Sequence, residues 1–141
     1  MILNKLLLLP LFLHVLLIIF VGIRTIRARF KSVRTGQTKL GDIAVNAGAW
    51  PRRVQQLGNN FDSQFDLPML WYSCCGLLVA TGLTDVISVA LSWFFLLARL
   101  VHTSVHIGAN DVPTRMRVYL AGFVAVVFMW VWFGIRFYVI G

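Results

Sequence analysis

The residues most able to do chemistry lie in a short polar stretch between two long apolar runs in the second half of the chain. Arg99, His102 and His106 are spaced i, i+3, i+7, which places them on one face of a helix. Arg115 and Tyr119, spaced i, i+4, share a helix face in the same way. Guanidinium groups bind carboxylates and stabilise thiolates. Ionisable groups beside membrane segments are costly unless they face a bundle interior, a water-filled cavity or the interface.

Composition defines the class of protein that must position these groups. The chain has 141 residues, of which 59% are hydrophobic and only 13% are charged, whereas about 25% charged residues is usual in soluble domains. Mean hydropathy is +0.80. The sequence therefore predicts an all-α integral membrane protein with a single domain over residues 1–141. We expect four spans, at about 6–23, 53–83, 86–106 and 114–140.

The first and second spans carry distinct signals. The run Leu6–Ile23 is followed by basic residues and not by a small-residue cleavage site, which favours a membrane helix over a signal peptide. Residues 31–39 have no apolar period and are predicted to form a loop. Arg52–Leu83 reads as one long helix with a polar first half, and Pro68 is expected to kink it.

The charge distribution predicts orientation. The net charge is +8, and most of the bases lie beside apolar runs, which favours topology signals and anionic lipid over nucleic acid as the explanation. The first connection carries eight bases: Arg24, Arg27, Arg29, Lys31, Arg34, Lys39, Arg52 and Arg53. The positive-inside rule then places this connection in the cytoplasm and both termini on the non-cytoplasmic side.

Several motifs together resemble one family. Ala98-Arg-Leu-Val-His-Thr103 is followed by Pro113-Thr-Arg115 and Tyr119, and the second span begins with the polar segment Asn59–Pro68. This order and spacing resembles the MAPEG superfamily, the membrane-associated proteins of eicosanoid and glutathione metabolism. The likeness covers nearly the whole chain, and the Asn59–Pro68 segment resembles the bacterial-type branch. A bacterial inner membrane is the expected location.

The resemblance implies a four-helix membrane bundle that assembles as a homotrimer and binds glutathione between subunits. It implies that Arg115 approaches the glutathione sulfur, with Tyr119 as a binding neighbour. Further candidate binding residues are implied by the resemblance or lie next to the implied positions. They are Arg53, Asn59, Asn60, Asp62, Gln64, Asp66, Arg99 and His102.

The sequence departs from the family pattern in the acid and the aromatic residues. It contains no glutamate, so the family's second-helix acid corresponds to Gln64 or Asp66, depending on register. His106 occupies a position where the family pattern predicts a tyrosine. His102 and His106 have the spacing of some metal-ligand pairs, but no cysteine or glutamate is near them in sequence, and we expect no metal site.

Two functions remain open on these residues. The first is a glutathione-dependent membrane transferase or peroxidase acting on lipophilic electrophiles, in which a guanidinium stabilises the thiolate of a thiol with a pKa of about 8.5. The second is a non-catalytic MAPEG-like membrane protein or an accessory subunit of a larger complex. In that case Arg115 is a membrane anchor, and Arg99 pairs with Asp62 or Asp66 inside the bundle.

Overall fold

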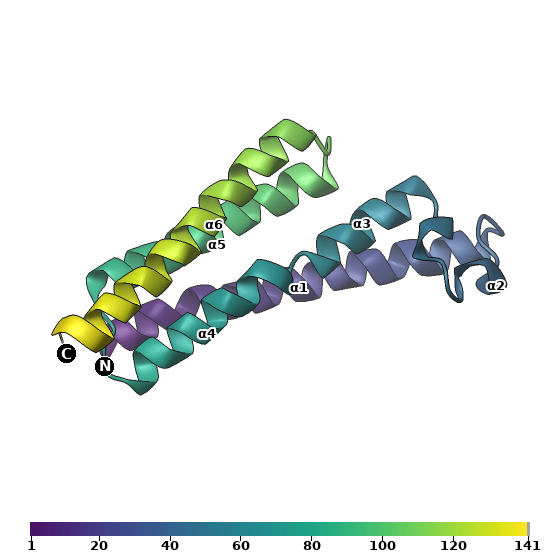
Figure 1. Ribbon diagram of the computed structural model, residues 1–141. Helices are drawn as coiled ribbons and strands as arrows, with labels where there is room; N and C mark the ends of the chain where they lie inside the picture. Colours follow the sequence, from purple (N-terminus) through teal and green to yellow (C-terminus); the bar gives the residue numbers. More distant parts are fainter. Residues whose placement is uncertain (141) are drawn as a thin grey trace.

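The computed structural model describes residues 1–140, which form helices joined by short connections (Figure 1). The elements are α1 (Ile2–Arg34), α2 (Leu40–Ile43), η1 (Ala47–Ala49), α3 (Arg52–Asp62), α4 (Asp66–Ala80), α5 (Val86–Ile107), α6 (Val112–Ile135) and η2 (Arg136–Ile140). Three of these helices are long and apolar enough to cross a membrane, namely α1, α5 and α6 with its extension to Val139. The chain is therefore an all-helical integral membrane protein.

The first helix is longer than the apolar run that starts it. α1 continues for a further 11 residues beyond Ile23, so the predicted loop at residues 31–39 is wrong for its first part, which is helical to Arg34. Packing against α3 explains the extension. The Thr25 hydroxyl donates to the Leu57 carbonyl oxygen at 3.1 Å. Gly22 leaves room for the Phe61 ring, which a Cβ at that position would approach to 3.1 Å.

The predicted continuous helix over Arg52–Leu83 is also wrong, because a turn at residues 63–65 divides it into α3 and α4. The backbone N–H groups of Gln64 and Phe65 bond three residues back, to Phe61 and Asp62, at 3.0 Å each. Proline explains the position of the break, because Pro68 has no N–H to donate to the carbonyl four residues earlier. In the first turn of α4 that loss costs nothing, so Pro68 starts a helix and does not kink one.

The core lies between α1, α4, α5 and α6 and is centred on Trp71 and Phe95. Both rings are fully buried, with centroids 4.7 Å apart. The Trp71 indole donates to the Ser92 hydroxyl at 3.1 Å, and that hydroxyl donates to the Leu7 carbonyl oxygen at 3.1 Å. Hydrogen bonds of this kind leave few polar groups unpaired inside the bundle.

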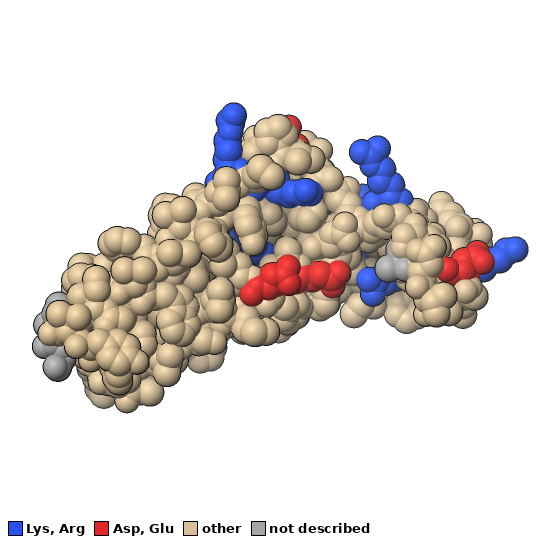
Figure 2. All heavy atoms as spheres, in the orientation of Figure 1, with Lys and Arg blue, Asp and Glu red and all other residues tan. Residues whose placement is uncertain are grey.

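The helices run up and down along one long axis (Figure 1). The two termini lie together at one end, and the connections α1–α3 and α5–α6 lie toward the other. On the face shown in Figure 2, the end with the termini carries no blue or red side chains, whereas charges gather from the middle to the opposite end. This distribution separates an apolar part, suited to lipid, from a charged part, suited to the membrane surface.

Reporter fusions test the arrangement of the helices across the membrane. Gln37 lies in the connection after α1, and the sequence predicts three further spans between it and the C-terminus, in the part of the chain that forms α3 with α4, α5 and α6. We expect a reporter at Gln37 and one at the C-terminus to lie on opposite sides of the membrane. Accessibility of both reporters from the same side would contradict this topology.

A cluster around Asp85 closes the end of the bundle that carries the termini. Asp85 caps α5 by accepting from the Ser88 N–H at 2.8 Å. Its second carboxylate oxygen accepts from Trp132 at 2.7 Å and from Arg136 at 2.6 Å. Burial opposes the ionisation of Asp85, but the hydrogen bonds from Ser88 and Trp132 and the charge of Arg136 together hold its pKa below the ordinary value of 3.8.

A carboxylate whose pKa is lowered by folding stabilises the fold above its unfolded pKa, and the gain is lost as pH falls through the folded pKa. We therefore expect Asp85→Asn to lower the free energy of unfolding at neutral pH. The difference from wild type should shrink below about pH 4. Unfolding titrations in detergent at several pH values measure it. A difference that stays constant down to the acid limit would show that the charge of Asp85 contributes nothing.

Candidate functional site

A cleft of about 340 Å³ lies where the turn between α3 and α4 meets the end of α5 and the start of α6. Four of the predicted catalytic and binding residues line it, and they come from three different elements: Asp66, His102, Arg115 and Tyr119. The remaining lining residues are Ser63, His106, Val112 and Met116. The cleft therefore combines one carboxylate, one guanidinium, two imidazoles and a phenol with apolar walls.

The two histidines form the buried side of the cleft. His102 is 5% exposed and His106 6%, and their ring centroids are 5.6 Å apart. The Tyr119 ring lies 6.1 Å from that of His102. Within residues 1–140, neither Nδ1 atom has a hydrogen-bond partner. Buried polar atoms without partners are rare in folded proteins, and they suit a site that receives a polar ligand.

Arg99 lies beneath the cleft and attaches α5 to the α3–α4 turn. It is 2% exposed, and its Nη2 donates to the Ser63 carbonyl oxygen at 2.8 Å and to the Ser63 hydroxyl at 3.2 Å. Its Nε and Nη1 have no partner among the described residues. A buried guanidinium with unpaired N–H groups costs free energy, which an anionic ligand would recover.

The alternative in which Arg99 pairs with Asp62 or Asp66 is wrong. Within residues 1–140, the one salt bridge joins Arg136 to Asp85. Asp62 and Asp66 are exposed, and Asp66 lines the cleft. The acidic side chains are thus not consumed in a closed ion-pair network.

Arg115 is positioned by the turn that precedes α6. Its Nη1 donates to the Asn110 side-chain oxygen at 2.6 Å. Asn110 adopts a left-handed backbone conformation with a φ of 53°, which asparagine tolerates better than most residues. Asp111 caps α6 by accepting from the Thr114 N–H at 3.0 Å. Arg117, two residues further on, is exposed and does not line the cleft.

Three predicted binding residues lie away from the cleft. Asn60 and Gln64 are fully buried in a polar network, in which Gln64 accepts from His14 at 3.1 Å and donates to Thr103 at 3.1 Å. Gln64 therefore holds the α3–α4 turn against α1 and α5. Arg53 is exposed and donates to the Ile107 carbonyl oxygen at 2.5 Å, joining α3 to the end of α5.

The last two predicted residues, Asn59 and Asp62, line a separate cleft of about 150 Å³ between α1, η1 and α3. Sequence reasoning missed Arg29 there, whose guanidinium lies over the Trp50 ring, 5.5 Å from its centroid. Gly58 permits this approach, since a Cβ at that position would lie 3.2 Å from Arg29 Nη2. The signal that could have found Arg29 is its i+7 spacing from Gly22 on the helix face that packs against α3.

Ser63, Val112 and Met116 also line the main cleft without having been predicted as site residues. Ser63 lines the cleft because it lies in the turn between α3 and α4, which was not predicted. Met116 follows Arg115 directly, and nothing in its type marks it as a site residue.

Together these features define an all-helical integral membrane protein with a polar cleft at the charged end of its bundle. The family model of the MAPEG family matches residues 7–135, and the chain belongs to that family. No curated protein and no solved structure matches the chain significantly. Family membership indicates a glutathione-related membrane function in general terms.

Proposed function

We propose that this protein is a glutathione-dependent membrane transferase or peroxidase that acts on lipophilic electrophiles, with the main cleft as its active site. The observation that carries the proposal is the pair of buried, unpartnered Nδ1 atoms of His102 and His106 in the cleft wall, with the unpaired Nε and Nη1 of the buried Arg99 on the same helix. A site built only for packing would pair or exclude such atoms.

The residues of the cleft fit the chemistry of glutathione. The tripeptide carries two carboxylates, an amine and a thiol. Arg99 has two nitrogens without partners, Nε and Nη1, that can donate to an anionic group, and Asp66 offers a carboxylate for the amine. Asp66, and not the buried Gln64, is therefore the better counterpart of the missing glutamate.

When bound, glutathione would supply a thiol nucleophile. Arg115 would favour the thiolate through its fixed positive charge, and Tyr119 would donate a hydrogen bond to it. His102 and His106 would bind polar groups through their free Nδ1 atoms. Val112 and Met116 would contact the apolar part of the electrophile.

We further propose that the protein acts as a homotrimer of four-span subunits, with α3 and α4 together forming one span. Neither α3 with 11 residues nor α4 with 15 reaches the length that a membrane span requires, whereas the two in sequence exceed it. The clefts that hold Asp66 and Asp62 are separate, so adjacent subunits could each contribute one of them. The protein would lie in a bacterial inner membrane, with both termini on the non-cytoplasmic side.

Native mass spectrometry tests the assembly. In mild detergent we expect the mass of three chains, because the exposed apolar surface of α5 and α6 offers area for helix packing between subunits. A monomer, or a stable one-to-one complex with an unrelated protein, would favour the accessory-subunit alternative.

Glutathione titration tests the function. We expect saturable binding and an ultraviolet difference absorbance from the thiolate. The glutathione analogue with serine in place of cysteine should compete for binding without giving that absorbance. Conjugation of an aryl chloride and reduction of a lipid hydroperoxide would separate transferase from peroxidase activity. Absence of both binding and thiolate absorbance would overturn the proposal and leave a non-catalytic family member.

A further inference from the structure

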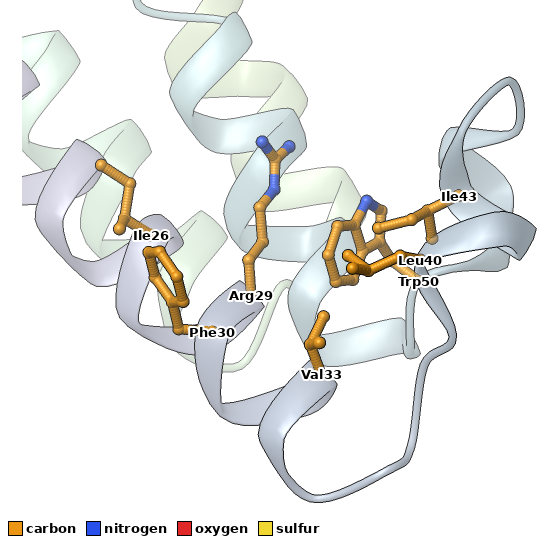
Figure 3. A pocket seen from close by; sticks show the side chains of 7 residues that line it. All are labelled: Ile26, Arg29, Phe30, Val33, Leu40, Ile43 and Trp50. Carbon is orange, nitrogen blue, oxygen red and sulfur yellow. The ribbon is translucent and has the colours of Figure 1, made fainter.

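A further groove of about 410 Å³, apolar except for Arg29, lies at the charged end of the molecule, away from the main cleft. Figure 3 shows Ile26 and Phe30 of α1 on one side and Leu40, Ile43 and Trp50 on the other. Phe30 is 73% exposed and Leu40 68%. Large apolar side chains exposed to this extent are unfavourable in water, and lipid or protein is expected to cover them.

The depth of the groove suits the membrane interface. The apolar run of α1 ends at Ile23, and Ile26 and Phe30 follow it by about 4.5 and 10 Å of helix. The hydrocarbon core is about 30 Å thick and the whole bilayer about 40–45 Å, so head groups occupy the few ångströms beyond the core. Head groups extend about 5–7.5 Å beyond the core on each side. The groove thus begins at Ile26, at the depth of the glycerol and the phosphate, and reaches the outer limit of the head groups at Phe30. Trp50 has the side chain most typical of this depth.

A stripe of exposed bases runs beside the groove. Arg24, Arg27, Lys31 and Arg34 are spaced i, i+3, i+7, i+10 and share one helix face, adjacent to the face that carries Phe30. The carboxylate of Asp42 lies on α2 nearby, so positive charge predominates. Beside an apolar groove at head-group depth, this charge is complementary to an anionic phosphate.

We propose that this groove is a binding site for an anionic phospholipid, with the glycerol and the first carbons of an acyl chain against Ile26, Phe30 and Trp50 and the phosphate on the basic stripe. The groove shares no lining residue with the main cleft, but Arg29 and Trp50 also line the smaller cleft that holds Asp62. The site would hold the end of α1 and the connection to α3 at the membrane surface.

Quenching of Trp50 fluorescence by brominated lipid tests the proposal. The protein is placed in bilayers of equal parts phosphatidylcholine and phosphatidylglycerol, with bromine on the acyl chains of one lipid at a time, so that bulk composition never changes. The emission of Trp50 is taken as the difference between wild type and Trp50→Phe. We expect quenching to be about twofold or more stronger when phosphatidylglycerol carries the bromine. Equal quenching by the two lipids would overturn the proposal.

Two variants distinguish the contribution of the basic stripe to lipid binding from that of the groove. Arg27→Gln/Lys31→Gln/Arg34→Gln should bring the quenching ratio to about one, whereas the control Lys5→Gln/Arg117→Gln, equally exposed, should keep it. Val33→Phe should fill the groove and weaken quenching by either lipid. A ratio that survives the triple substitution, or that is lost in the control as well, would overturn the proposal. Disulfide crosslinking of Leu40→Cys between copies would show a subunit interface in place of a lipid site and would also overturn it.

Discussion

Replacing Arg115 with leucine is expected to lower glutathione conjugation at neutral pH steeply while leaving glutathione binding largely intact. Arg115 lines the cleft as its one guanidinium, whereas Arg99 below it would hold carboxylates. Loss of one charge-assisted contact costs about 1.5–3 kcal/mol, which is about one to two powers of ten in thiolate stabilisation. Leucine keeps part of the apolar stem, so the fold should be retained.

The pH profile distinguishes this role from a structural one. Activity of Arg115→Leu should partly recover at alkaline pH, where the thiol ionises without help, and thiolate absorbance at neutral pH should fall in parallel. Arg117→Leu is the matched control, because Arg117 is exposed and outside the cleft. Equal loss in both variants would mean that the two arginines serve only as membrane anchors.

Phe95→Ala is expected to cause a large loss of stability for a single truncation in the core. Its ring is fully buried, lies 4.7 Å from Trp71 and packs against the helix surface at Gly122. In soluble cores such a truncation costs about 3–5 kcal/mol. We expect the free energy of unfolding to fall by about 2–4 kcal/mol here. Moving an apolar side chain from the core to lipid costs less than moving it to water, whereas the packing contacts are lost in either case.

Phe94→Ala provides the control, since Phe94 is the adjacent residue on α5 and is 49% exposed. Reversible unfolding in mixed detergent micelles measures both variants, and Phe94→Ala should change the free energy of unfolding by less than about 1 kcal/mol. A comparable loss in Phe94→Ala would place that side chain in an interface between subunits and not in contact with lipid.

The sequence by itself determined the class of the protein and much of its site. Composition and the long apolar runs were enough for an all-helical membrane protein, because a lipid environment requires backbone groups to be satisfied within helices. Helical spacing predicted that Arg115 and Tyr119 share a face, and both line one cleft. The motifs from Ala98 to Tyr119 also pointed to the family to which the chain belongs.

Only the tertiary structure decided which polar residues face the cleft and which are buried. Pro68 limits where α4 can begin, but the turn at residues 63–65 is also held by side-chain contacts of Gln64 with His14 and Thr103, which are distant in sequence and which local periodicity could not reveal. That turn places Ser63 and Asp66 at the cleft and Gln64 in the core. The length of α1 was likewise decided by packing against α3, because Thr25 and Gly22 acquire partners only when the two helices meet.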